Sequence, residues 1–344
     1  PERARCRAFP SRFPSPFLSR TTQTTDAFGP PIAGGPRFWG NLSPQEDVWR
    51  NDTNKTVLAL LGIGASALVA LLVVILVVAV SLAGGSQQEE TSLPSDQLQV
   101  EDLYEGTRSI PKFDYPQNQY DSQLFVEQDG FLRYDDGKAV IGVDVSEHQG
   151  DIDWQAVADA GVEFVMLRVG YRGMTQGLLN ADATFAQNYE EARAAGLQVG
   201  AYFFSQAITD AEAQAEADFA VETLDGRELD YPLVFDWEPP LPSEELPAED
   251  LRAYAMTGEE ITGFAKAFSQ RVEELGYIPC VYTNKHMAYN TFNLTELNKY
   301  DLWYAEYQPV PSLYYHFRMW QYTASGTVPG ISGDVDINIC FDPY

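Results

Sequence analysis

From residue 139 onward, short apolar runs alternate along the chain with segments of helical periodicity. The runs are rich in β-branched and aromatic residues, which is typical of buried strands. Between the runs, apolar residues recur three and four positions apart, as on one face of a helix. This repeated strand–helix–strand order predicts parallel strands joined by right-handed crossovers. The first five expected strands are 139–145, 163–170, 198–205, 232–238 and 278–284.

The helices between these strands have recognisable ends. Two of them open with the Thr-x-x-Glu pattern of a capping box, Thr209 with Glu212 and Thr257 with Glu260. The helix after Thr257 carries a continuous apolar face, and Gly276 follows it as a C-terminal cap. Two helices come before these in the chain. The first is expected to follow Asp153 and end before Gly161, and the second to run from near Asp182 to Gly196.

Three further strand-like runs complete the pattern, at 301–307, 317–323 and 334–339. The last two gaps are short and show no helical face, whereas a parallel crossover needs about a dozen residues or more. We therefore expect the last strands to add antiparallel. Eight strands with about five helices predict an α/β fold, a modified (β/α) barrel that is irregular in its last third. An open doubly wound sheet is the alternative, but no Gly-x-Gly-x-x-Gly follows the first strand.

The chain before residue 139 has a different character. Residues 57–83 carry no charge over 27 positions, enough to span a bilayer as a helix, so we expect a transmembrane signal anchor at 56–83. A cleaved signal peptide is the rival, but its apolar region is usually only about 7–15 residues long. Residues 1–55 hold eight basic residues and are rich in Pro and Ser, which predicts a disordered cytoplasmic segment. The polar, acidic segment 84–138 is expected to be an extracellular stalk or linker, followed by a catalytic domain at 139–344 outside the cell membrane.

Composition limits the partners. The chain has 50 Asp and Glu against 22 Lys and Arg, a formal charge of -28, which argues against nucleic acid as a partner. Cys280 and Cys340 fall in strand-like runs, where either a disulfide or two buried free thiols is consistent with the sequence. No Cys-x-x-Cys or His-x-x-x-His pattern indicates a metal site, and we expect no cofactor.

Acidic residues interrupt two of the apolar strands. In 232–238 the sequence is PLVFDWE, so Asp236 and Glu238 share one face of the strand while Leu233, Phe235 and Trp237 share the other. Central parallel strands are covered on both sides, so a merely solvated acidic face fits poorly here. Active sites of such barrels lie at the carboxyl ends of the strands. We therefore predict that Asp236 and Glu238, with Asp144 near the end of the first strand, point into the barrel mouth.

Clustered carboxylates raise one another's pKa, which keeps one protonated while another stays charged. Glycoside hydrolysis uses this arrangement, and binding of Mg²⁺ or Ca²⁺ is the competing interpretation. Aromatic residues near the other strand ends favour a sugar substrate as a group, because their rings stack on sugar rings, although each one alone is better explained as part of a packed core. The expected substrate-binding residues are Tyr202, Phe204, Tyr282, Trp303, Tyr307 and Trp320.

At this point specific motifs match a known family. The segments GVDVSEHQGDIDW (142–154), PLVFDWE (232–238) and WQYTASGTVPGISGDVDIN (320–338), in this order, resemble glycoside hydrolase family 25, the muramidase-type lysozymes. The resemblance covers roughly residues 139–344 and none of 1–138. It implies a barrel of about five β/α units plus three extra strands. It also implies a bacterial peptidoglycan hydrolase that cleaves the β-1,4 bond between N-acetylmuramic acid and N-acetylglucosamine with retention.

The resemblance also implies roles for individual residues. Glu238 matches the general acid/base, and Asp236 is its partner carboxylate, acting either as nucleophile or as stabiliser of an intermediate formed by the substrate's acetamido group. Asp144 and Asp336 match two further site carboxylates, and Tyr202 a substrate-contacting tyrosine. The implied partner is the peptidoglycan glycan strand, bound by a monomeric enzyme. A catalytically silent wall-binding module, or a glycosidase acting on another N-acetylhexosamine polymer, is the alternative.

Overall fold

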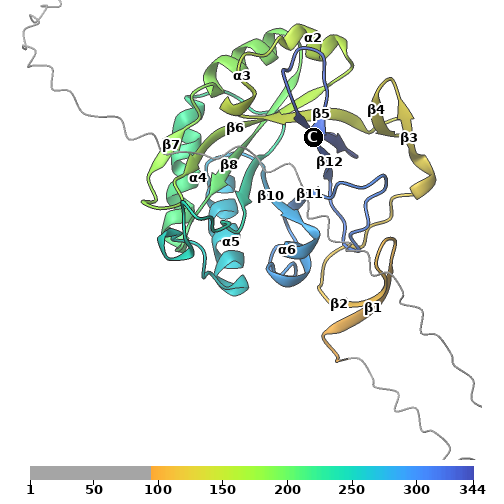
Figure 1. Cartoon of the computed structure of the whole chain (residues 1–344), viewed down its shortest axis with the longest axis vertical. Coiled ribbons are helices and arrows are strands. Elements are labelled where there is room, and N and C mark those ends of the chain that lie inside the picture. Colours follow the sequence, from red (N-terminus) through yellow and green to blue (C-terminus); the bar gives the residue numbers. More distant parts are fainter. Residues whose placement is uncertain (1–93) are drawn as a thin grey trace, which may run out of the picture. The chain divides into compact units, whose positions relative to one another are not determined.

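Eight strands close into a barrel in the computed structural model, which describes residues 94–344 (Figure 1). Neighbouring strands follow the order β5-β13-β12-β11-β10-β9-β8-β6, and a further pairing of β5 with β6 closes the ring. The short strand β7 (Leu179–Ala181) adds antiparallel to β6 outside the ring. The bounds of the barrel strands are Val140–Val145 for β5, Phe164–Arg172 for β6, Gln198–Ser205 for β8, Leu233–Trp237 for β9, Pro279–Asn284 for β10, Asp301–Ala305 for β11, Met319–Gly326 for β12 and Val335–Cys340 for β13.

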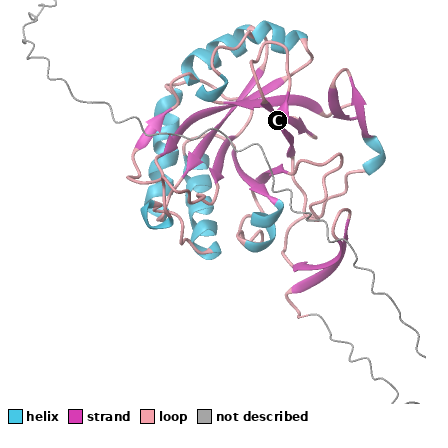
Figure 2. Ribbon diagram, viewed as in Figure 1, coloured by secondary structure: helices cyan, strands magenta, loops and turns pink. Residues whose placement is uncertain are grey.

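A helix follows each of the first five barrel strands and lies on the outside of the barrel (Figure 2). The barrel therefore has five β/α units followed by three strands without helices of their own, which agrees with the predicted α/β barrel. Short 3₁₀ turns lie at Glu147–Gln149 and Ala248–Asp250. The bounds of the helices are Trp154–Asp159 for α2, Phe185–Ala194 for α3, Asp210–Leu224 for α4, Gly258–Glu274 for α5 and Lys285–Asn290 for α6.

The predicted direction of the last strands is right for β13 and wrong for β12. β13 pairs antiparallel with both β12 and β5, but β12 runs parallel to β11. The crossover at 306–318 contains no helix, and an earlier segment of the chain, around residues 116–118, hydrogen-bonds to it instead. Asn118 N–H donates to Tyr314 O at 2.8 Å, and His316 N–H donates to Pro116 O at 2.8 Å. A crossover that is held by a distant segment needs no helical periodicity of its own. The sequence of 306–318 therefore gives no sign that β12 runs parallel to β11.

Two apolar layers hold the barrel together. The outer layer lies between the strands and the helices, and Leu233, Phe235 and Trp237 belong to it, as their alternation predicts. The inner layer fills the barrel and includes Phe164 and Tyr231, whose rings stack at 4.4 Å between centroids. The remaining members of the inner layer are Met166, Val234, Cys280, Tyr282, Trp303, Ala305, Met319 and Cys340. Burial of apolar surface of this kind is the main favourable contribution to folding.

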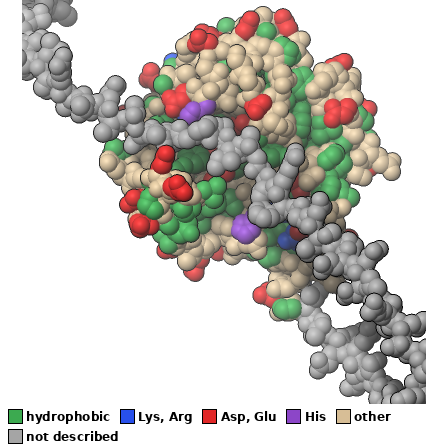
Figure 3. All heavy atoms as spheres, in the orientation of Figure 1, with side chains coloured by type: hydrophobic (Ala, Val, Ile, Leu, Met, Phe, Trp, Pro, Cys, Tyr) green, Lys and Arg blue, Asp and Glu red, His purple; other side chains and the backbone are tan. Residues whose placement is uncertain are grey.

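Cys280 and Cys340 are both buried in that inner layer as free thiols. The structure therefore selects free thiols over a disulfide, the two alternatives that the sequence leaves open. Acidic side chains are spread over the visible face of the molecule and basic ones are few, as the net charge of -28 predicts (Figure 3).

The chain before the barrel forms two small hairpins within the described residues. The first consists of β1 (Gln97–Asp102) and β2 (Gly106–Pro111), and the second of β3 (Phe125–Gln128) and β4 (Phe131–Tyr134), preceded by a 3₁₀ turn at Ser122–Leu124. These elements fall within the segment for which the sequence predicts a stalk, and the limits of that stalk remain a prediction.

Over residues 94–344, no helix combines the length and the apolar character needed to cross a bilayer. The predicted span 56–83 and the predicted cytoplasmic segment 1–55 lie outside the described residues. Both therefore stay predictions.

Candidate active site

A polar cleft of about 220 Å³ lies at the barrel mouth, where the carboxyl ends of the parallel strands meet. It arises from strand alternation: along each barrel strand, residues two apart point inward, and the inward positions nearest the mouth are polar or aromatic. The residues that line the cleft are Asp144, Arg168, Tyr202, Phe204, Asp236, Glu238, Tyr282, Trp303, Tyr307, Gln321 and Asp336. All four carboxylates predicted from the sequence are therefore brought together.

Asp236 and Glu238 enter the cleft from the end of β9. Val234, two residues before Asp236, belongs to the inner apolar layer, so the same face of the strand changes from apolar to acidic toward the mouth. Asp236 is only 6% exposed, and its Oδ1 accepts no hydrogen bond from the described residues. A buried acceptor left without a partner is costly, so this oxygen is a natural acceptor for a donor on a bound substrate.

Asp144 and Asp336 face each other across the antiparallel pairing of β5 with β13, in which they are direct partners. Asp144 Oδ2 accepts hydrogen bonds from Gln321 Nε2 at 3.0 Å and from Asn338 Nδ2 at 2.7 Å. Burial raises the pKa of Asp144 to about 6, against these two hydrogen bonds, which lower it. Burial and the nearby charge of Asp144 raise the pKa of Asp336 to about 8.

The other two carboxyl groups are shifted in the same direction. Burial raises the pKa of Glu238, and the charge of Asp144 raises it further. Burial also raises the pKa of Asp236, followed by the charges of Glu238 and Asp144, while Arg168 acts in the opposite sense. Four carboxyl groups with raised pKa values in one cleft do not all ionise together near neutral pH. The site therefore retains at least one proton that can be donated, beside at least one negative charge.

Arg168 is a cleft residue that the sequence reasoning missed. Its guanidinium donates to Asp182 Oδ2 at 2.8 Å through Nε and to Glu147 Oε1 at 3.0 Å through Nη2. It is the one basic residue among those that line the cleft in the described chain. The signal available in the sequence was a charged residue inside the apolar run VMLRVG, on the same face of β6 as Met166.

Gln321 and Asn338 are two further polar residues that the sequence reasoning missed. Asn338 is fully buried, accepts from Trp303 Nε1 at 2.8 Å and donates to Asp144. Gln321 Oε1 accepts from Tyr282 Oη at 3.1 Å and from Tyr307 Oη at 3.0 Å. Alternation offers a signal for Asn338, because it lies two residues after Asp336 and so shares its face.

Five of the six predicted aromatic residues line the cleft, and Trp320 does not. Trp320 lies between Met319 and Gln321, which both point into the barrel, so its ring points outward. It is fully buried there, packs edge-on against Phe125 at 5.4 Å, and donates from Nε1 to Glu306 O at 2.9 Å. The prediction that Trp320 lies at the substrate site is therefore wrong: alternation along β12 assigns it to the outer layer.

No group of three or more His, Cys, Asp and Glu side chains in residues 94–344 has the spacing of a metal site. What the cleft presents is a set of paired carboxylates with one arginine, bordered by aromatic rings. Such a set is suited to proton transfer beside a developing positive charge, which is the chemistry of glycosidic bond cleavage.

Comparison with known proteins connects this site to a family. Residues 143–331 match the model of the glycosyl hydrolases family 25. The chain is 30% identical over 198 residues to the autolytic lysozyme of Clostridium acetobutylicum, covering 57% of this chain and 54% of that protein. It is also 30% identical over 213 residues to lysozyme M1 of Streptomyces globisporus, covering 59% of this chain and 68% of that protein.

A solved structure shares the fold. The modular autolysin LytC of Streptococcus pneumoniae, solved in complex with a synthetic peptidoglycan ligand, superposes with a TM-score of 0.52 at 21% identity. The match covers 72% of this chain and 57% of LytC. The chain thus spans little more than half the length of both LytC and the clostridial lysozyme.

Proposed function

We propose that this chain, which belongs to the glycosyl hydrolases family 25, is an N-acetylmuramidase. It carries the glycoside hydrolase barrel of that family. Its substrate would be peptidoglycan, and the bond cleaved would be the β-1,4 bond between N-acetylmuramic acid and N-acetylglucosamine. The observation that carries this proposal is the convergence of Asp144, Asp236, Glu238 and Asp336 in one cleft. The lysozymes among the relatives support the choice of substrate.

In this proposal Glu238 is the general acid. Its pKa is raised by burial and by the charge of Asp144, which favours the protonated form needed to donate to the leaving glycosidic oxygen. After the bond breaks, the same carboxylate takes a proton from the incoming water. The two steps on one face of the sugar give retention of configuration at the anomeric carbon.

Asp236 is the partner of Glu238. Its buried Oδ1, which accepts nothing from the described residues, is available to the substrate. In one role this carboxylate bonds to the anomeric carbon, and in the other it stabilises an intermediate formed by the acetamido group of the substrate. A 2-deoxy-2-fluoro glycoside substrate, followed by mass spectrometry of the intact protein, distinguishes the two roles, since only the first leaves a sugar bonded to Asp236.

The remaining polar residues set the charge and the position of these two acids. Asp144 is fixed by Gln321 and Asn338 and, when ionised, holds the proton on its neighbours. Burial and the charges of Glu238 and Asp144 raise the pKa of Asp236; Arg168 opposes that rise and so acts in favour of the charged form of this carboxyl group. The aromatic residues Tyr202 and Trp303, whose rings lie 5.9 Å apart, form part of the wall along which a glycan strand would lie.

The decisive test is the variant Glu238→Gln on purified peptidoglycan. We expect it to lose turnover by at least about a hundredfold, because the amide cannot donate the proton, while the melting temperature stays near that of the wild type. Mass spectrometry of the released fragments should show N-acetylmuramic acid at the new reducing ends. Glu163→Gln, which changes an exposed glutamate just before β6 at the opposite end of the barrel, is the matched control.

Three outcomes would contradict the proposal. Full activity of Glu238→Gln would remove the assigned acid, and binding of peptidoglycan without new reducing ends in the wild type would indicate a wall-binding module. Release of chito-oligomers from chitin without release of muropeptides would indicate a different N-acetylhexosamine polymer. Proton NMR of the first-formed product tests retention, because the β-anomer must precede the α-anomer.

We further propose that the enzyme works in cell-wall remodelling or lysis from the outer face of the cell membrane, anchored by residues 56–83. The support is the uncharged run of 27 residues and the basic residues that precede it. Membrane fractionation of cells that express the chain tests this. Mature protein found only in the culture supernatant, beginning near residue 84, would contradict the anchor.

A further inference from the structure

The β1–β2 hairpin lies in the chain before the residues that match the family, yet it contacts helix α6 of the barrel. A two-stranded hairpin is at best marginally stable by itself in water. Most of the side chains on β1 and β2 are exposed or partly exposed, so few apolar contacts hold the hairpin together. Its order therefore depends on the places where it contacts the rest of the chain.

The turn of the hairpin is built around Asp102. One of its oxygens, Oδ1, accepts from the backbone N–H groups of Tyr104 at 2.9 Å and Glu105 at 3.0 Å. The other, Oδ2, accepts from Lys285 Nζ at 3.0 Å. The Asp102 side chain is 1% exposed. A carboxylate buried to this extent needs a charged partner, and Lys285 on α6 supplies it.

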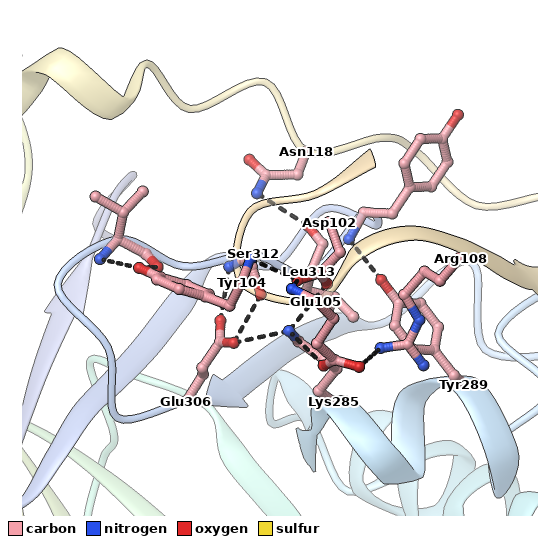
Figure 4. Close-up of polar contacts among 12 residues, drawn as sticks. Asp102, Tyr104, Glu105, Arg108, Asn118, Lys285, Tyr289, Glu306, Ser312 and Leu313 are labelled. Atoms are coloured by element: carbon pink, nitrogen blue, oxygen red, sulfur yellow. Dashed lines mark hydrogen bonds and ion pairs between the residues drawn. The ribbon is translucent and has the colours of Figure 1, made fainter. Parts of the chain in front are cut away.

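Lys285 joins the hairpin to the loop after β11 (Figure 4). Its ammonium lies 3.0 Å from Glu306 Oε1 and 3.2 Å from Glu105 Oε1, in addition to Asp102. Three carboxylates thus share one lysine. Hydrogen bonds to Asp102 and Glu306 raise the pKa of Lys285, although burial alone would lower it. The ammonium therefore stays charged and holds the three groups together.

Tyr104 makes a second connection to the same loop. Its hydroxyl donates to Val310 O at 2.8 Å and accepts from Val310 N–H at 3.2 Å. Glu306 in turn accepts from Ser312 N–H and Ser312 Oγ, each at 2.6 Å, which closes the loop on itself. The loop of residues 306–312 is therefore held at its start by Lys285 and at its middle by Tyr104.

The same loop carries an active-site residue. Tyr307 directly follows Glu306, lines the cleft and donates to Gln321 Oε1 at 3.0 Å. Gln321 holds Asp144 through its other side-chain atom, Nε2. A continuous series of contacts thus runs from Asp102 through Lys285 and Glu306 to Tyr307 and the carboxylates. Tyr307 is 55% exposed, so packing against the barrel restrains its side chain only in part.

We propose that the β1–β2 hairpin positions Tyr307 at the barrel mouth, with Lys285 and Tyr104 as positioning residues, and so sets the affinity of the site for a glycan strand. The inference rests on the proposed function, because a glycan strand is the ligand that Tyr307 would contact. The hairpin acts on binding rather than on the proton transfers, since none of its residues lines the cleft. A segment outside the family match thereby becomes part of the working enzyme.

The first experiment uses Tyr104→Phe in the full chain. This change removes the two hydrogen bonds to Val310 and keeps the ring, and Tyr104 is partly exposed, so the variant should fold. Hydrogen exchange of residues 306–312 should become faster, and KM and Kd for peptide-free peptidoglycan glycan strands should rise roughly threefold to tenfold, with kcat changed less than about twofold. Tyr277→Phe, which removes one side-chain to backbone hydrogen bond away from the cleft, is the matched control.

The second experiment is a double-mutant cycle with Tyr307→Ala. If the hairpin acts through Tyr307, Tyr104→Phe should add nothing to the Kd once Tyr307 is absent. Lys285→Met should have the same signature with a larger effect, although it leaves Asp102 and Glu306 without their cation and lowers stability. Tyr104→Phe keeps the proposal testable even if Lys285→Met does not fold.

The outcomes separate this proposal from the proposed function. Unchanged exchange of residues 306–312, or faster exchange with unchanged Kd, overturns the positioning role. Equal effects of Tyr104→Phe with and without Tyr307 overturn it as well. If the wild type binds glycan strands without cleaving them, the muramidase function fails while the Kd comparison still decides the role of the hairpin. If the wild type neither binds nor cleaves them, both proposals fail.

Discussion

Among single residues, Asn338 shows most directly how the interior of the barrel controls the site. It is fully buried, accepts from Trp303 Nε1 and donates to Asp144 Oδ2 at 2.7 Å. A hydrogen bond donated to a carboxylate stabilises its ionised form. Asn338 therefore limits how far burial raises the pKa of Asp144, which in turn determines whether Asp144 is charged when Glu238 must hold its proton.

Asn338→Ala should move the pH profile of the enzyme in a definite direction. Loss of the donor raises the pKa of Asp144 above its value of about 6, so the acidic limb of kcat/KM should shift to higher pH. Stability should fall by roughly 1–3 kcal/mol, because Trp303 Nε1 loses its buried acceptor. The measurement is kcat/KM on soluble glycan strands between pH 4 and about 9. Asn298→Ala, at an exposed position, is the control, and an unshifted acidic limb would show that Asp144 does not govern the profile.

At the scale of elements, helices α4 and α5 begin with the same sequence signal and end up with different contacts. At α5 the capping box is complete, with Thr257 and Glu260 bonded to each other's backbone N–H groups. At α4 Thr209 caps the helix, but Glu212 binds the guanidinium of Arg252 at 2.9 and 2.6 Å. Glu212 also accepts from Ile208 N–H at 3.1 Å, so one carboxylate serves both the backbone just before α4 and its tertiary partner Arg252.

This difference predicts unequal effects of equal substitutions. Glu212→Gln should lower the midpoint of urea unfolding clearly more than Glu260→Gln, because it weakens a partly buried ion pair rather than an exposed cap. It should also lower kcat, since Arg252 donates to Gln206 O, and Gln206 donates in turn to Glu238 O at 3.0 Å. Equal shifts of the two midpoints would mean that the pair with Arg252 adds nothing beyond a cap. Thr257→Ala, expected to cost about 1 kcal/mol, calibrates the scale.

For the whole molecule, closure of the barrel is what makes a site out of separate strands. Asp144 on β5 and Asp336 on β13 are about 190 residues apart in sequence and become direct partners only when the ring closes. Closure requires close approach at Gly142, where a side chain would overlap the ring of Phe164 inside the barrel. Gly142 pairs with Phe164 on one side and with Asn338 on the other.

Gly142→Ala should therefore weaken the closure of the barrel. Overpacking at this position should destabilise the protein by roughly 1–3 kcal/mol. Activity should fall as well, because a weakened β5–β13 pairing no longer holds Asp144 and Asp336 side by side. Thermal unfolding and turnover of peptidoglycan measure the two effects. Gly173→Ala is the control, because an added Cβ there meets only ordinary contacts. A melting temperature equal to that of the wild type would show that the ring tolerates the extra methyl group.

Much of this protein follows from local patterns in its sequence. The period-2 alternation in PLVFDWE determines that Asp236 and Glu238 point away from the helices, because side chains two apart on a strand share a face. The same local logic gave the five β/α units, the helix caps and three of the four acids, since each depends on residues only a few positions apart, whereas Asp336 was implied only by the family resemblance. The predicted span at 56–83 is of the same kind and waits for a direct test.

Only the tertiary structure decided the features that depend on residues far apart in the chain. Side chains along β12 alternate between the inside and the outside of the barrel, but the sequence alone does not say which set points inward. Pairing with β11 and β13 turns Trp320 outward and Gln321 inward. The parallel direction of β12 depends on residues 112–120 covering its crossover, and the position of Tyr307 depends on contacts that lead back to Asp102. Such contacts leave no periodic trace, because each partner is fixed by the path of the whole chain and not by its neighbours in sequence.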